Sequence, residues 1–355
     1  MLSETSYAFL KRLLETPGPS GFERAPARVW RDEARGFAEV HGDVMGNSFA
    51  VVNPGGSPTI LLAGHIDEIG LIVTWIDDAG YVYFAPIGGW DPQVLVGQRV
   101  KLQGRDGEVL GVIGKKPIHL MKPDEREKAS KITDLWIDIG ATSKAEAQER
   151  VHVGDAGVLD ARMLEMPNGR IVSRAIDDRV GAFIVLEAAR RYAEKPGAAR
   201  VVAVATTQEE IAWRGGGAIV GAVHVSPAMS VVVDVTFASD HPGIEKKEHG
   251  EAALGGGPVL TRGSVVSPVA FGLLRDAAET LKLPYTVHAA GRESFTDADA
   301  IHNAREGIAT ALLSIPNRYM HSPNEMVALE DLDRAADVIA EACRNVTADT
   351  DFTDR

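Results

Sequence analysis

The 355-residue sequence contains a single cysteine, Cys343. One cysteine cannot form an intrachain disulfide and cannot build a thiolate metal site. Because disulfides belong to oxidising compartments, their absence favours a cytoplasmic location. The sequence also lacks any apolar run near the ~20 residues that a membrane-spanning helix needs. We therefore expect no membrane partner.

Basic residues are also fewer than acidic residues. The sequence has 37 Lys and Arg against 50 Asp and Glu, a formal net charge of −13. A chain this acidic repels phosphate backbones, so nucleic acid is not an expected partner. The hydrophobic content of 45% and the charged content of 25% are ordinary for a globular enzyme with one large domain or two modest ones.

Two patterns divide the chain. Residues 70–163 consist of short apolar or alternating runs separated by Gly and Asp-Gly turns, which predicts an inserted small β-rich domain. On either side, strand-like apolar runs alternate with helical stretches such as 4–16 and 330–346. This alternation predicts an α/β domain, a mostly parallel sheet flanked by helices, built from residues 1–69 and 164–355.

Residue types that bind metals follow three of the predicted strands. In chain order they are His65 with Asp67, the pair Glu209-Glu210, and Asp234. In an open α/β sheet, ligands bind at the carboxyl ends of the strands. The shared position of these residues is therefore more informative than any of them alone.

The pair Glu209-Glu210 is the most informative of these motifs. Adjacent glutamates at a strand end repel each other, unless one binds a cation while the other stays free to accept a proton from water. We assign Glu210 as a metal ligand and Glu209 as the general base. An exposed acidic turn is the alternative interpretation of this pair.

His65 and Asp67 lie two residues apart on extended backbone, so both side chains can point the same way. His65 is then a metal ligand and Asp67 orients the metal site. The alternative is a histidine at a strand end held by a nearby carboxylate, with no metal.

Asp177 and Asp178 precede a helix, where acidic residues are favoured by capping alone. We assign Asp177 as a carboxylate that bridges two cations and Asp178 as the helix cap. Asp234 follows three valines and needs a partner if it is buried. His321 follows another strand, and a lone histidine there is often structural. The full set nevertheless supplies two imidazoles, three carboxylates and one spare carboxylate, which suits two divalent cations and a base.

Several segments together resemble a known family. They are "ETPGPSGFE", "AGHIDEIGLIV", "IGGWDPQVLVGQRV", "AIDDRVGA", "TTQEE", "VDVTFASDHPG", "FTDADAI" and "RYMHSPNE". From about residue 10 to 340 and in this order, they are similar to the tetrahedral (TET) family of dinuclear metallo-aminopeptidases, which includes glutamyl and deblocking aminopeptidases and relatives described as endoglucanases.

The resemblance implies a role for each candidate. The implied metal ligands are His65, Asp177, Glu210, Asp234 and His321. Asp177 would bridge the two ions, His65 and Asp234 would hold one of them, and Glu210 and His321 the other. Glu209 matches the base and Asp67 the orienting acid.

The resemblance also implies a fold, an activity and an assembly. The fold is an α/β peptidase domain whose inserted β-rich domain carries dimer contacts, and dimers often build a hollow tetrahedral dodecamer. The activity is removal of N-terminal residues from short peptides with two divalent metal ions per subunit. Zinc is expected, and cobalt and manganese also suit imidazole and carboxylate ligands.

The sequence departs from the family pattern at two places. Val-Gly-Leu-Arg-Gly usually follows the paired glutamates, whereas this chain has Trp213 within the corresponding segment 211–215. Phe295 stands where glycine is common. Both positions lie where the pocket for the first substrate side chain is expected, so the specificity of relatives does not transfer.

Three other functions also fit the sequence. A glycanase would use paired carboxylates without two metals. A related metallo-carboxypeptidase or deacylase would differ in its use of free-amine and capped peptides. A non-catalytic peptidase-like assembly module is the third alternative, although such modules typically lose ligands or the base and here every position is filled.

Overall fold

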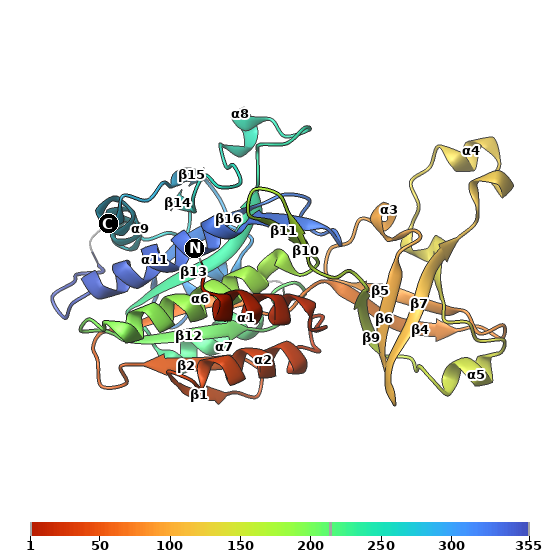
Figure 1. The fold of residues 1–355 in the computed structure, drawn as a ribbon, viewed down its shortest axis with the longest axis horizontal. Coiled ribbons are helices and arrows are strands. Elements are labelled where there is room, and N and C mark those ends of the chain that lie inside the picture. The colour runs from red at the N-terminus through yellow and green to blue at the C-terminus, as the bar shows by residue number, and fades with distance from the viewer. Residues whose placement is uncertain (1, 213–214, 354–355) are drawn as a thin grey trace.

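The computed structural model describes residues 2–212 and 215–353. A large α/β domain and a smaller β-barrel lie side by side along the long axis of the molecule (Figure 1). The eight-stranded sheet of the large domain has the order β1 (Glu39–Gly42), β2 (Ser48–Val52), β12 (Arg200–Thr206), β3 (Thr59–His65), β13 (Met229–Phe237), β16 (Ala309–Asn317), β14 (Val259–Gly263) and β15 (Thr286–Ala290).

The four central strands β12, β3, β13 and β16 run parallel to one another. Their residues are almost all buried Val, Leu, Ile and Ala, as expected for parallel strands covered on both faces. Because Thr206 lies opposite His65 in the register, the strands β3 and β12 end together at one edge of the sheet. This edge positions the candidate metal centre.

Helices flank the sheet. They are α1 (Glu4–Glu15), α2 (Arg24–Ala34), α6 (Ile176–Glu194), α7 (Gly216–Val225), α9 (Pro268–Leu281), α10 (Asp297–Ile301) and α11 (Leu329–Asn345), with the short α8 (Lys246–His249) in a loop. The expected first helix is confirmed, and Ser3 caps it by accepting the Ser6 N–H at 3.0 Å. The expected last helix, 330–346, is confirmed as α11.

Helix α6 is the central element of the hydrophobic core. It is buried along most of its length, and Phe183 packs on Phe9 of α1 with ring centroids 5.7 Å apart. The helix approaches β3 very closely, since a β-carbon added at Gly64 would lie 2.4 Å from the backbone of Gly181. Two glycines therefore let the helix that follows Asp177 pack directly against the strand that ends at His65.

The small domain is a closed barrel with its own apolar core. Its strands, in barrel order, are β4 (Gly70–Ile76), β5 (Val82–Ile87), β8 (Leu135–Asp138), β7 (Gly107–Lys115), β6 (Arg99–Gly104) and β9 (Ala156–Leu159). The short helices α3 (Pro92–Leu95), α4 (Pro123–Arg126) and α5 (Lys144–Gln148) lie in its loops, and α4 projects away from the barrel body (Figure 1).

The predicted fold class, a mostly parallel sheet flanked by helices with a small β-rich domain, is confirmed. The sequence pattern missed a second, three-stranded sheet of β10 (Leu164–Met166), β11 (Arg170–Ser173) and β17 (Glu325–Ala328). It also missed β14, which runs antiparallel to β16. Within residues 2–212 and 215–353, no helix combines the length and apolarity needed to cross a bilayer.

Candidate metal centre

Asp177 lies between two imidazoles from distant parts of the chain. His65 Nε2 is 3.2 Å from Asp177 Oδ1, and His321 Nε2 is 3.3 Å from Asp177 Oδ2. His65 stands at the last position of β3, Asp177 at the start of α6, and His321 in the loop between β16 and β17. Each oxygen of one carboxylate thus faces a different histidine, which is the arrangement that a bridging ligand requires.

Glu209 and Glu210, in the loop after β12, point to different parts of this cluster. Glu210 Oε1 lies 3.4 Å from His321 Nε2, whereas Glu209 Oε2 lies 3.9 Å from His65 Nε2. The Oε1 atom of Glu210 is buried and has no hydrogen-bond partner among the described residues. A buried carboxylate oxygen without a donor is costly, and a cation would relieve that cost.

The candidate ligands form two overlapping groups. His65, Asp177 and Glu210 can offer atoms that all lie within 4.8 Å of one another, and so can His65, Asp178 and Asp234. The second group contains Asp178, which the sequence analysis assigned as a helix cap. These groups contain four of the five expected ligands together with Asp178. The fifth, His321, adjoins them through Asp177 and Glu210, and the expected base Glu209 lies beside His65.

Asp178 has other partners for both of its oxygens. Oδ1 accepts the N–H of Gly181 at 3.1 Å, and Oδ2 accepts the N–H of His65 at 3.2 Å. The first bond caps the helix that follows and the second ties that helix to the end of β3. The peptide bond between Asp177 and Asp178 is cis.

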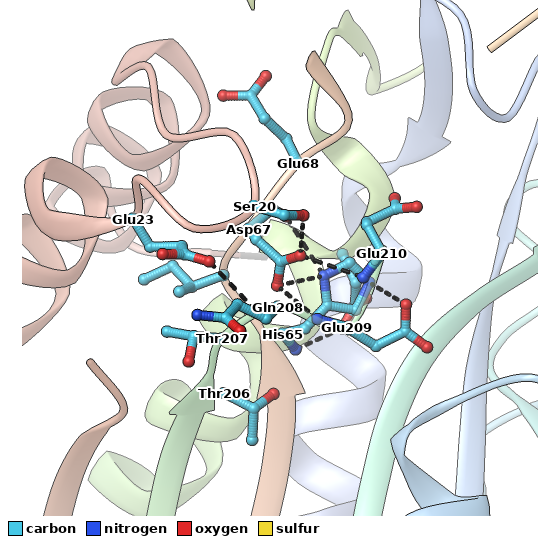
Figure 2. A network of polar contacts seen from close by, with 12 residues as sticks. Ser20, Glu23, His65, Asp67, Glu68, Thr206, Thr207, Gln208, Glu209 and Glu210 are labelled. Carbon is cyan, nitrogen blue, oxygen red and sulfur yellow. Dashed lines mark hydrogen bonds and ion pairs between the residues drawn. The ribbon is translucent and has the colours of Figure 1, made fainter. Parts of the chain in front are cut away.

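Asp67 organises the loop beside His65 (Figure 2). It is fully buried, its Oδ1 lies 3.5 Å from His65 Nδ1, and it accepts the backbone N–H groups of Glu209 and Glu210 at 3.2 Å each. Ser20 donates its hydroxyl to Asp67 at 2.5 Å. One carboxylate thereby holds a histidine and both glutamates in place.

Glu325 has a comparable position on the other side of the cluster, and sequence reasoning missed it. Its Oε2 accepts the N–H of Asp177 at 3.1 Å, and its Oε1 accepts the N–H of His321 at 3.0 Å. Asp297 was missed too; it is buried and accepts the Thr206 hydroxyl at 2.5 Å. The only available signal was that both acids stand in the quoted motifs "RYMHSPNE" and "FTDADAI".

Negative charge is crowded into this buried site. Burial raises the pKa of the Asp234 carboxyl well above its usual range; His65 counters this, while Asp177 raises it further. Burial likewise raises the pKa of Glu209, where His65 again lowers it and Asp234 raises it. Protons or metal cations must offset so many neighbouring carboxylates.

The surrounding carboxylates favour the charged form of both histidines and so raise their pKa values. Burial alone lowers the pKa of His321, but its contacts with Asp177 and Glu210 outweigh that effect and raise its pKa to about 11. Burial also opposes charge on His65, and its contacts with Asp177 and Asp67 raise its pKa well above the usual value. Two imidazoles held among carboxylates form a donor set that fits zinc, cobalt or manganese.

The cluster opens into a large cavity of about 1250 Å³. His65, Asp177, Glu209, Glu210, Asp234 and His321 all line it. Phe295, the departure noted in the sequence, also lines this cavity. Trp213, the other departure, lies outside the described residues.

An α/β sheet that gathers histidines and carboxylates at its strand ends, beside an open cavity, is the arrangement expected of a hydrolase. Comparison with known proteins specifies the family. Residues 46–338 match the M42 glutamyl aminopeptidase family, and the chain belongs to it.

Individual relatives cover nearly the whole chain. The lysyl aminopeptidase of Pyrococcus furiosus is 34% identical over 98% of this chain and 99% of its own. The TET aminopeptidase of a marine sediment archaeon, Thaumarchaeota archaeon SCGC AB-539-E09, superposes with a TM-score of 0.92 at 35% identity over 97% of each chain. The TET1 peptidase of Pyrococcus horikoshii, which can assemble into a tetrahedron or a large octahedral shell, has a TM-score of 0.84 at 29% identity over 96% of this chain and 100% of its own. The family and these relatives support an aminopeptidase function.

Proposed function

We propose that this protein is a metal-dependent aminopeptidase that removes N-terminal residues from short peptides with two divalent cations per chain. The observation that carries the proposal is the position of Asp177, whose two carboxylate oxygens lie 3.2 and 3.3 Å from the imidazoles of His65 and His321. The buried Oε1 of Glu210 also supports it, because this atom makes no hydrogen bond among the described residues and lies 3.4 Å from His321 Nε2.

The proposed ligands are those expected from the sequence. His65 and Asp234 would hold one ion, Glu210 and His321 would hold the other, and Asp177 would bridge them. Asp178 is left out of the ligand set because both of its oxygens already accept backbone N–H groups. Zinc is the proposed metal, and cobalt and manganese remain alternatives for the same donors.

In the proposed reaction the cations, when bound, act as Lewis acids toward water and the scissile carbonyl. Glu209 accepts the proton of the attacking water and delivers it to the leaving amine. Asp67 keeps Glu209 in reach by binding its backbone N–H while contacting His65.

We propose that residues 1–69 and 164–355 form the catalytic domain, and that residues 70–163 form an inserted domain that carries dimer contacts. We also propose self-association to dimers and a tetrahedral dodecamer. The single cysteine favours a cytoplasmic location.

Replacement of Glu209 by glutamine tests the proposed chemistry. The amide keeps the shape but cannot accept the proton, so kcat should fall by roughly 10²- to 10⁴-fold, while metal content stays at the wild-type level. Hydrolysis of aminoacyl p-nitroanilides and elemental analysis measure the two effects.

Glu248→Gln is the matched control, because Glu248 lines the same cavity but is exposed. Near-wild-type turnover by Glu209→Gln would contradict the assignment of the base. Glycan cleavage that survives complete removal of metal would instead favour a glycanase.

A further inference from the structure

Phe295 adopts an unusual conformation at the cavity of the metal centre. Its φ is +58°, in the left-handed region where a residue with a β-carbon is strained. Its side chain is nevertheless 64% exposed, so burial of the ring does not compensate for the strain. Strained residues of this kind cluster at functional sites.

Asp299 holds this conformation in place. Its Oδ2 accepts the N–H of Phe295 at 2.8 Å, and its Oδ1 accepts the N–H and the hydroxyl of Ser294 at 2.9 and 2.8 Å. Thr296 then caps α10 by accepting the N–H of Ala298 at 3.2 Å. Three hydrogen bonds to one carboxylate fix the segment, so the ring is presented by a built structure.

Phe295 lines the same cavity as the metal centre, and it is not the only apolar residue there. Phe295 stands two residues before Asp297, whose charge acts on the Glu209 carboxyl. The large apolar side chains Ile211 and Phe237 line the same cavity and are 50% and 53% exposed. The cavity therefore offers apolar surface to whatever enters.

Arg292 adds a positive charge at the same place. Its guanidinium carbon lies 5.9 Å from the centroid of the Phe295 ring. Next to the ring, a cationic substrate side chain would be repelled by this charge, whereas Glu248 and Glu293, which also line the cavity, carry the opposite charge. An apolar side chain would meet no such penalty and would cover ring surface that water now contacts.

We propose that Phe295 is a specificity-determining residue whose ring contacts the side chain of the substrate's N-terminal residue and selects large apolar residues. The inference rests on the proposed aminopeptidase function. It sets this chain apart in preference from a relative that is a lysyl aminopeptidase.

The test compares leucyl, alanyl, lysyl and glutamyl p-nitroanilides with the metal-loaded enzyme and its Phe295→Gly variant. The wild type should prefer the leucyl substrate. The variant should lose about tenfold in kcat/KM for the leucyl substrate, mainly through KM, and less than about twofold for the alanyl substrate. Because glycine adopts a positive φ without strain, the variant should also melt about 2 °C higher.

Tyr81→Ala is the control, since Tyr81 is a partly exposed aromatic residue of the barrel outside the cavity. It should leave the order of substrates unchanged. A wild type that prefers the lysyl or glutamyl substrate, or a Phe295→Gly variant with unchanged selectivity, overturns this inference alone. A wild type inactive on all four substrates overturns the proposed function and this inference with it.

Discussion

Asp177 and Asp178 are adjacent carboxylates with different partners. Asp177 faces two imidazoles, whereas Asp178 accepts two backbone N–H groups. The first residues of the helix leave N–H groups free for a cap, and Asp178 accepts one of them, that of Gly181. Residue type alone does not distinguish the two acids; the direction in which each carboxylate points does.

Asp297 gives a pH-dependent prediction at the residue scale. Burial raises the pKa of its carboxyl to about 6, although His65 and Thr206 act to lower it. A folded-state pKa above the unfolded value means that the stabilising proton is fully bound below about pH 4 and is lost as the pH rises through 6. Above that pH the folded, metal-free protein carries an unfavourable buried charge.

Asp297→Asn removes this charge and keeps an acceptor for Thr206. The variant should therefore gain stability relative to the wild type as the pH rises from 4 to 7, by up to about 3 kcal/mol. Urea denaturation of both chelator-treated proteins at several pH values measures the difference. A difference that does not vary with pH would contradict the buried ionisation of Asp297.

At the scale of elements, the contact between β3 and α6 links the fold to the site. Gly64 precedes His65 in β3, and Gly181 follows Asp178 in α6. A methyl group at Gly64 would meet backbone atoms at 2.4 to 2.8 Å, which neither element can avoid without moving. A shift here changes the distance between His65 and Asp177.

Gly64→Ala should consequently destabilise the protein by about 1–3 kcal/mol and weaken metal retention. Gly55→Ala is the matched control, because a methyl group at Gly55 meets nothing within 4 Å. Chemical denaturation and metal content of both variants are the measurements. Equal stability and equal metal content in the two variants would show that the close approach of β3 and α6 does not set the geometry of the site.

The elements also show what a sequence can predict. Long apolar runs such as β3, β12 and β13 predicted the sheet and the ends of its strands, because full burial leaves a local signal. The small sheet of β10, β11 and β17 left no such signal in the sequence. Its strands have only three or four residues, and β17 joins from a distant part of the chain.

The same limit explains which parts of the site were predicted. The ligand candidates stand at strand ends or in recognisable motifs, so their residue types and positions indicated their role. The role of Glu325 depends on pairing between β17 and β11, which sets it opposite Ser173, four residues before Asp177. Such long-range register is invisible in one sequence, and so the hydrogen bonds that orient the candidate ligands were not predicted.

At the scale of the whole molecule, the prediction concerns the number of chains in the assembly. The barrel exposes apolar side chains near its projecting segment, with Ile118 57% and Leu120 70% exposed. Twelve chains of 37.9 kDa make a dodecamer of about 455 kDa, and two make a dimer of about 76 kDa. Light scattering should give the larger mass for the wild type if the proposed dodecamer forms.

A double substitution, Ile118→Asp with Leu120→Asp, should lower this mass by placing charge in an apolar contact. Val153→Asp is a control in the same barrel, at a valine that is 64% exposed and follows α5, which lies at the other end of the barrel from α4 (Figure 1). A wild-type monomer, or an unchanged mass for the double variant, would contradict the assignment of contacts to this domain.

The most direct measurement of the central claim is the metal content of Asp177→Ala beside that of the wild type, by elemental analysis after loading with zinc and gel filtration. A carboxylate shared by two ions predicts about two ions per chain in the wild type and loss of both in the variant. His321→Ala, which removes a ligand of one ion, should retain about one. Two ions retained by Asp177→Ala, or fewer than two bound by the wild type, would contradict the dinuclear centre.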